Sequence, residues 1–295
     1  MNTPLYGCVE AGGTKFMVGI AGGPDDIRET VRIDTTTPEE TIGATLNWLK
    51  AAEERHAPLT AIGIASFGPL ELDRKAKNWG HITATTKPEW SNTDFAARVA
   101  REMFTYVGFD TDVNGAALAE ARWGAGLDQK VSVYLTIGTG IGGGAIIDGR
   151  TLHGLSHPEM GHIRPQRHHA DLDFLGICPF HGDCLEGLAS GPAIKARWGV
   201  SLSELPNDHP AHEIIAFYLA QVVVTLQSIM EPGRVILGGG VMATPGLIER
   251  VRAAADQLGS AYFRGKAQEI IVPPGLGDRA GLLGALILAQ DVGLA

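Results

Sequence analysis

The 295-residue chain has only three cysteines, which cannot all pair with one another. No basic and apolar leader precedes Gly7, so we expect these cysteines to be reduced thiols or metal ligands in a cytoplasmic protein. No run of eighteen consecutive apolar residues is present either, and we therefore expect no membrane span.

Positive charge is also scarce. Lys and Arg number 24 against 33 Asp and Glu, which gives a formal net charge of −9. Because nucleic-acid binding depends on clustered positive charge, we expect no nucleic-acid partner. Hydrophobic residues at 44% and charged residues at 19% are typical of a globular chain that buries a core. The length suits one large domain or two modest ones.

Glycine, in contrast, is abundant, with 39 residues. Phosphate oxygens need several backbone N–H donors aimed at one point, and residues without side chains allow that approach. A single glycine hairpin is also a common structural turn, but three glycine-rich turns favour a nucleotide bound between two related domains. The candidate phosphate-binding residues are Gly12, Gly13, Thr14, Lys15, Gly138, Thr139, Gly140, Gly238, Gly239 and Gly240.

Hydrophobic periodicity predicts an α/β chain. Strands are expected at residues 6–9, 16–21, 61–65, 109–113, 131–137, 145–147 and 234–237. Helices are expected at residues 37–54, 92–106, 116–123, 213–230, 245–258 and 281–290. The pattern of strand, glycine turn and strand occurs near the N-terminus and again after residue 130, which indicates two halves with related βββαβα cores.

Two histidines and two cysteines have a spacing typical of metal ligands. His162, Cys178, His181 and Cys184 form the pattern H-x15-C-x2-H-x2-C. Tetrahedral Zn²⁺ takes four such ligands, and a closed set of four protein ligands makes the metal structural. The alternative is ordinary histidines beside two buried thiols. Cys8 lies inside the first expected strand and is expected to be a buried, inert thiol.

Asp112 is the candidate catalytic residue. It lies at the end of an expected strand, where a carboxylate can orient a hydroxyl group and accept its proton. The residues alone leave a second interpretation open, because Asp112 or Asn114 could simply cap the helix that follows.

Six motifs then carry a resemblance that runs from Tyr6 to Gln290. They are Glu10-Ala-Gly-Gly-Thr-Lys15, Thr111-Asp-Val-Asn-Gly-Ala-Ala-Leu-Ala-Glu120, Leu135-Thr-Ile-Gly-Thr-Gly-Ile-Gly-Gly-Gly144, Ser156-His-Pro-Glu-Met-Gly-His162, Cys178–Pro192 and Val235-Ile-Leu-Gly-Gly-Gly240. In this order they resemble the sugar-kinase, Hsp70 and actin superfamily. More narrowly they resemble the ROK family (repressors, open reading frames and kinases) and its zinc-containing bacterial fructokinase branch.

The resemblance implies a fold and a domain division. The fold is α/β, with two ribonuclease H-like or actin-like βββαβα domains flanking a cleft and a zinc-bound insertion at 157–186. A smaller domain is expected over residues 1–112, completed by a C-terminal helix at 281–295, and a larger one over residues 113–280. A homodimer is common in the family and is expected here.

The resemblance also implies an activity. It is the ATP-dependent phosphorylation of D-fructose to fructose 6-phosphate, with Asp112 as general base and a structural zinc at the four ligands. Glu10 is expected to reach the nucleotide's Mg²⁺ through water. The expected sugar contacts are Asn114, Glu159, Lys87, Trp90 and Glu186, and Pro192 is expected at the nucleotide.

Alternatives remain within this resemblance. Trp90 could equally be a core aromatic residue, and Glu186 a solvated side chain. A broader hexokinase acting on mannose or glucose is the second interpretation, and a non-catalytic sugar sensor is the third. ROK repressors carry an N-terminal helix-turn-helix, which we do not expect here because the first phosphate loop begins at Glu10.

Overall fold

The computed structural model describes residues 4–259 and 262–293, and this part of the chain forms two compact units. The first unit contains the described residues up to Ala119, the short segment His153–His157 and the chain from Gly277 onward. The second contains Glu120–Leu152 and Pro158–Leu276. Residues 294–295 of the C-terminal helix expected at 281–295, and residues 1–3 of the expected N-terminal domain, lie outside the described residues.

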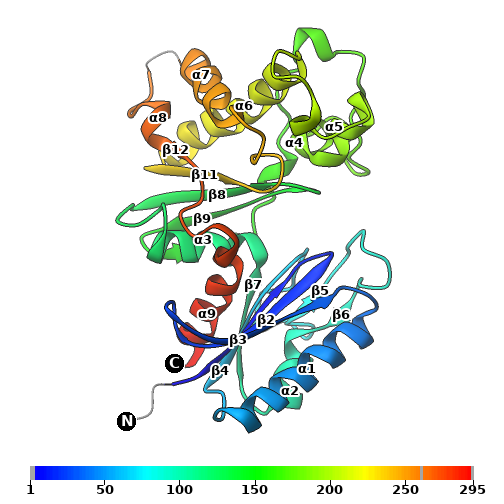
Figure 1. Ribbon diagram of the computed structural model, residues 1–295, viewed down its shortest axis with the longest axis vertical. Helices are drawn as coiled ribbons and strands as arrows, with labels where there is room; N and C mark the ends of the chain where they lie inside the picture. Colours follow the sequence, from blue (N-terminus) through cyan, green and yellow to red (C-terminus); the bar gives the residue numbers. More distant parts are fainter. Residues whose placement is uncertain (1–3, 260–261, 294–295) are drawn as a thin grey trace. The chain divides into compact units, whose positions relative to one another are not determined.

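The first unit is built on a five-stranded sheet (Figure 1). Its strand order is β3 (Asp26–Asp34), β2 (Lys15–Gly23), β1 (Tyr6–Ala11), β4 (Ala61–Ser66) and β7 (Tyr106–Thr111). The first three strands are antiparallel, whereas β4 and β7 run parallel to β1. Strands β1 and β4 are buried almost throughout, as expected for central parallel strands.

Helices cover this sheet. Helix α1 (Pro38–Arg55) begins as its sequence predicts, with Thr37 as N-cap accepting a hydrogen bond from the backbone N–H of Glu40 at 3.3 Å. Helix α9 (Ala280–Gly293) packs directly on β1, β4 and β7. The packing is close because Gly63 has no side chain: a Cβ atom there would lie 1.8 Å from the carbonyl oxygen of Ala285.

The second unit repeats this design. Its sheet has the order β10 (Arg150–Thr151), β9 (Ile141–Ile147), β8 (Val131–Ile137), β11 (Arg234–Gly238) and β12 (Ile271–Val272). Again three antiparallel strands are followed by two parallel ones. The two glycine hairpins, β1–β2 and β8–β9, hold equivalent places in the two sheets, so the predicted α/β fold with two related halves is confirmed.

Helices α6 (Ala211–Met230) and α7 (Leu247–Gly259) pack together in the second unit. Among the described residues, α6 is the helix that is long and apolar enough to cross a membrane, but half of its apolar stretch is buried inside the unit. Its buried side chains belong to the same core as β8 and β11. Burial in a core therefore accounts for its apolar character.

The remaining elements of the first unit are short, apart from α3. They are β5 (His81–Ile82), β6 (Thr93–Asp94), α2 (Ala96–Met103) and α3 (Asp112–Trp123), whose residues from Glu120 onward belong to the second unit. The second unit adds α4 (Leu185–Ala189), α5 (Gly191–Trp198), α8 (Ala267–Ile270) and 3-10 turns at Met160–His162, His169–Asp171 and Leu202–Glu204; another such turn, Gly277–Arg279, precedes α9.

Two of the predicted helices begin four residues away from their predicted starts. The helix expected at 92–106 is limited to α2, because Thr93–Asp94 pairs with β5 and Phe104 adopts a left-handed conformation (φ 50°) that ends the helix. The helix expected from residue 116 begins at Asp112, directly after β7. Strand β3 was missed, although its partly buried residues alternate at Ile27, Glu29, Val31 and Ile33.

Candidate active site

The first glycine turn joins β1 to β2. The N–H of Gly12 donates to the carbonyl oxygen of Lys15 at 2.9 Å, and the hydroxyl group of Thr35 donates to the carbonyl oxygen of Gly12 at 2.8 Å. These bonds hold a tight turn in which Gly13, Thr14 and Lys15 are exposed. The turn thus presents backbone N–H groups, a hydroxyl group and a cation on one surface, which suits phosphate oxygens.

Glu10 is the penultimate residue of β1, beside this turn, and is partly buried. Burial and the negative charge of Asp112 raise its pKa to about 7, while Lys15 opposes the shift. Its carboxyl group packs against the start of α9, where a Cβ atom on Gly281 would lie 2.2 Å from Glu10 Cδ. The two nearby carboxylates repel each other when both are ionised, and oxygen ligands of this kind suit Mg²⁺.

Asp112 is the first residue of α3. Thr111, not Asp112 or Asn114, caps the helix: its hydroxyl oxygen accepts the N–H of Asn114 at 3.1 Å. Asp112 Oδ1 accepts the N–H of Val113 at 2.9 Å, and burial raises the pKa of the Asp112 carboxyl group above its ordinary range. A carboxylate whose proton affinity is raised is a stronger base toward a hydroxyl group.

Asn114 is fully buried. Its Nδ2 donates to Asp110 Oδ1 at 2.7 Å, and its Oδ1 has no hydrogen-bond partner within the described ranges. The predicted sugar contact of Asn114 stays a prediction, because the structure shows the residue holding Asp110.

Lys87 and Trp90 lie together beside α1. Lys87 Nζ donates to the carbonyl oxygen of Thr35 at 3.3 Å, and the Trp90 indole N–H donates to that of Thr36 at 2.8 Å. Trp90 is fully buried and packs against Phe16, with ring centroids 5.7 Å apart. Its environment is that of the core aromatic residue considered as the alternative.

The second glycine turn joins β8 to β9 in the second unit. The N–H of Gly138 donates to the carbonyl oxygen of Gly140 at 2.9 Å. Glu186, on α4, accepts the N–H of Ile141 at 2.9 Å and lies so close that a Cβ atom on Gly140 would be 2.7 Å from it. Glu186 therefore braces this turn, a contact that the sequence did not predict.

A cavity of about 810 Å³ opens beside this turn. Its lining residues come from four segments of the second unit and are Gly138, Thr139, Gly191, Pro192, Ile194, Lys195, Ala196, Ser201, Leu202, Ser203, Gly240, Val241 and Thr244. Ligand pockets of this size class hold nucleotide-sized molecules. The cavity brings together four residues predicted at the nucleotide: Gly138, Thr139, Pro192 and Gly240. Lys195, Ser201, Ser203 and Thr244 were missed, because no motif distinguishes them.

The third glycine run follows β11. Gly239 has φ 91°, and a Cβ atom there would lie 2.4 Å from the carbonyl oxygen of Ile137. Only glycine fits this turn, which brings the backbone of the third glycine run against the end of β8.

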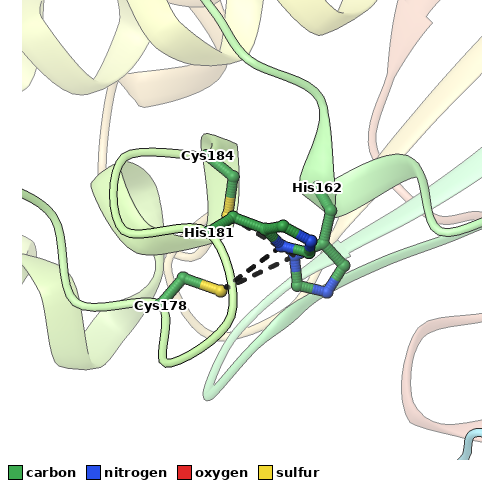
Figure 2. A group of neighbouring side chains, drawn as sticks. All are labelled: His162, Cys178, His181 and Cys184. Atoms are coloured by element: carbon green, nitrogen blue, oxygen red, sulfur yellow. Dashed lines mark hydrogen bonds between the residues drawn. The ribbon is translucent and has the colours of Figure 1, made fainter.

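The four predicted metal ligands converge (Figure 2). Their ligand atoms all lie within 4.8 Å of one another. His162 Nδ1 lies 3.3 Å from His181 Nδ1, 3.4 Å from Cys184 Sγ and 3.8 Å from Cys178 Sγ. Tetrahedral zinc with ordinary bond lengths would set neighbouring nitrogens about 3.4 Å apart and nitrogen–sulfur pairs about 3.5–3.6 Å apart. The donor set and its spacing therefore fit zinc.

The outer side of this cluster leads to Glu159. His162 Nε2 lies 4.0 Å from Glu159 Oε2, so the ring nitrogen that faces away from the other ligands points toward this exposed carboxylate. Carboxylates behind ligating histidines commonly fix the orientation of the ring.

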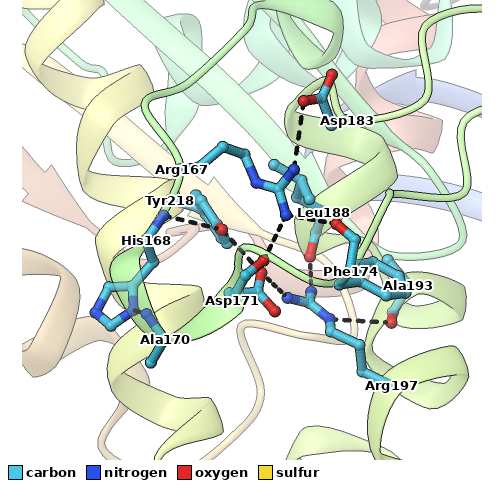
Figure 3. A network of polar contacts seen from close by, with 10 residues as sticks. All are labelled: Arg167, His168, Ala170, Asp171, Phe174, Asp183, Leu188, Ala193, Arg197 and Tyr218. Carbon is cyan, nitrogen blue, oxygen red and sulfur yellow. Dashed lines mark hydrogen bonds and ion pairs between the residues drawn. The ribbon is translucent and has the colours of Figure 1, made fainter.

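A partly buried polar network ties the loop that carries the predicted metal ligands to helix α5 (Figure 3). Asp183, between the predicted ligands His181 and Cys184, pairs with Arg167 at 3.4 Å. Arg167 in turn donates to the carbonyl oxygen of Asp171, and the carboxylate of Asp171 binds Arg197 of α5 at 2.5 Å and the hydroxyl group of Tyr218 at 2.8 Å. The neighbouring residues of α5 line the cavity, so the network fixes one of its walls.

These features define a class of protein. The structure has two related α/β units, glycine turns at equivalent hairpins and a nucleotide-sized cavity beside one of these turns. This combination is typical of the actin-like ATPase fold that sugar kinases use. A model of the ROK family matches residues 6–292, and the chain belongs to this family.

Individual relatives agree with this assignment. The fructokinase of Zymomonas mobilis is 51% identical over 289 residues, covering 97% of this chain and 96% of that protein. A putative fructokinase of Bacillus subtilis is 42% identical over 292 residues, with coverage of 97% and 96%. The crystal structure of a ROK hexokinase from Thermus thermophilus has a TM-score of 0.78 and 28% identity, covering 97% of this chain and 98% of that one.

Proposed function

We propose that the protein is an ATP-dependent fructokinase that converts D-fructose to fructose 6-phosphate. The observation that carries the proposal is the environment of Asp112, the first residue of α3, whose carboxyl group has a raised pKa. The neighbouring residues Asp110, Thr111 and Asn114 are hydrogen-bonded to one another, and we call these three residues with Asp112 the Asp112 corner. The choice of fructose is supported by the names of relatives at 51% and 42% identity over nearly the whole chain.

In the proposed reaction the sugar's 6-hydroxyl oxygen forms a bond to the γ-phosphorus of ATP. The bond between that phosphorus and the β,γ-bridging oxygen breaks, ADP leaves with the electron pair, and Asp112 accepts the hydroxyl proton. Such transfers depend mainly on positioning and on stabilisation of the charge on the phosphoryl group.

Phosphate binding is assigned to the glycine turns. Gly12, Gly13, Thr14 and Lys15 present their donors from the first unit, and Thr139 from the second. The cavity would hold the adenosine, with Pro192 and Gly240 at its wall. Glu10 would hold Mg²⁺ through water, since burial and the negative charge of Asp112 raise its pKa to about 7 and a cation would offset this concentration of negative charge. When bound, Mg²⁺ neutralises charge on the phosphate groups.

Sugar binding is assigned to both parts of the chain. Lys87 belongs to the domain proposed over residues 1–112, and Asn114, Glu159 and Glu186 belong to the domain proposed over residues 113–280. Zinc at His162, Cys178, His181 and Cys184 would hold the segment that carries Glu159. Both substrates are cytoplasmic metabolites, and we place the enzyme in the cytoplasm.

The test is turnover with Mg-ATP on fructose, mannose, glucose and N-acetylmannosamine, in wild type and in Asp112→Asn. We expect kcat/KM for fructose to exceed the others at least tenfold, and Asp112→Asn to lose at least a thousandfold in kcat while still binding ATP. Asp148→Asn, which alters an exposed turn carboxylate, is the matched control and should keep full activity.

Two outcomes would contradict the proposal. Equal turnover of glucose or mannose would favour the broader hexokinase, the activity named for the Thermus thermophilus relative. Binding of ATP and sugar without turnover of any sugar would indicate a sensor.

A further inference from the structure

His153, a histidine outside every motif described above, holds the Asp112 corner through a contact with Asp110. His153 lies at the start of the short segment His153–His157, which belongs to the first unit although the chain on both sides of it belongs to the second. The segment is fastened there by its side chains. Ser156 donates its hydroxyl to the carbonyl oxygen of Leu70 at 3.2 Å, and His157 Nε2 accepts the N–H of Leu70 at 3.2 Å.

His153 makes the third contact of this segment, and its partner is Asp110 of the Asp112 corner. Its Nε2 lies 2.9 Å from Oδ2 of Asp110, whose side chain is only 4% exposed. The other oxygen of Asp110 accepts the N–H of Thr111 and the Nδ2 of Asn114, both at 2.7 Å. Asp110 thus joins His153 to the two residues that flank Asp112 in the corner.

We infer that His153 is a positioning residue for the phosphoryl-transfer reaction, acting through Asp110 on the placement of Asp112. A carboxylate bound on one oxygen only can rotate, and the Thr111 N–H and the Asn114 amide would then lose a fixed acceptor. With His153 in place both oxygens are held. The inference rests on the proposed function, because it assumes that Asp112 is the base.

The electrostatics of the pair agree with this role. The hydrogen bond to Asp110 raises the pKa of His153, so the imidazolium form, which must donate to the carboxylate, is favoured. The His153 side chain itself is 43% exposed, so it can be replaced without opening a cavity in the core. An effect on turnover would therefore come from Asp110 and not from a loss of core packing.

The experiment compares three variants of the full-length enzyme. His153→Ala removes the donor, and we expect kcat for fructose to fall at least tenfold, with KM for ATP within twofold of wild type. His153→Gln places an amide Nε2 the same number of bonds from Cα as the imidazole Nε2, and should restore at least half of kcat. His56→Gln is the matched control, since His56 also pairs with a carboxylate of this unit (Glu29, at 3.1 Å), and should leave kcat unchanged.

A double variant tests whether the effect passes through Asp112. In Asp112→Asn the residual kcat should be the same with and without His153→Ala, because residues that act as one unit are not additive. The inference is overturned if His153→Ala keeps kcat within twofold of wild type, if His153→Gln fails to restore it, or if the losses add in the double variant. Full activity of Asp112→Asn alone would instead overturn the proposed function.

Discussion

Replacing Glu10 by glutamine should stabilise the protein at alkaline pH. The Glu10 pKa is raised from its ordinary 4.5 to about 7, first by burial and then by the charge of Asp112. Below pH 4.5 Glu10 is protonated in both the folded and the unfolded chain and has no effect. Between pH 4.5 and 7 the unfolded chain releases this proton while the folded chain keeps it, so stability falls as pH rises.

The magnitude follows from the shift. Each pKa unit corresponds to about 1.4 kcal/mol, so ionised Glu10 lowers the free energy of unfolding by about 3 kcal/mol above pH 7. Glutamine has the same shape and so fits the contact with Gly281. At roughly 2–4 °C per kcal/mol, the Tm of Glu10→Gln should exceed that of wild type by roughly 6–12 °C at pH 8 and match it near pH 4.5.

Differential scanning fluorimetry across this pH range, without Mg²⁺ or nucleotide, makes the measurement. Glu29→Gln is the contrasting control, because hydrogen bonds from Arg55 and His56 lower the pKa of Glu29. Removing the Glu29 carboxylate should therefore reduce Tm at pH 8. A difference between Glu10→Gln and wild type that is independent of pH would refute the reasoning, since only a shifted proton equilibrium produces the trend.

Three further predictions concern packing and the metal. Gly63→Ala should destabilise the protein by about 3 kcal/mol or more in urea unfolding, because its Cβ atom would overlap the backbone of α9. Gly43→Ala is the control, since a Cβ atom there meets open space in α1, and it should stabilise the protein by about 0.5–1 kcal/mol. Equal effects of the two variants would contradict the packing of α9 on Gly63. Cys184→Ser should lose bound zinc by elemental analysis and Cys8→Ser should keep it, and equal metal content would remove the proposed site. Trp90→Phe should lower the free energy of unfolding by about 1–2 kcal/mol, because the indole hydrogen bond is lost, and should leave KM for fructose unchanged. A raised KM with an unchanged free energy of unfolding would instead make Trp90 a sugar contact.

Much of the site was predictable because its signals are local. The Thr37-Pro38 helix start, the two glycine hairpins and the spacing of the histidine and cysteine ligands each depend on residues that are close in the chain. Such patterns reflect turn geometry and chelation, which hardly depend on distant segments. The ROK family and the α/β fold, read from these motifs, are both confirmed.

The sequence by itself thus determined the family, the repeated fold and the four residues of the metal cluster. Only the tertiary structure decided that Trp90 is buried, that Glu186 braces the β8–β9 turn, and that His153 reaches Asp110 across 43 residues of chain. It likewise decided the pKa of Glu10. The physical reason is that burial, electrostatic coupling and long-range hydrogen bonds depend on which distant segments meet, and no short sequence pattern records that.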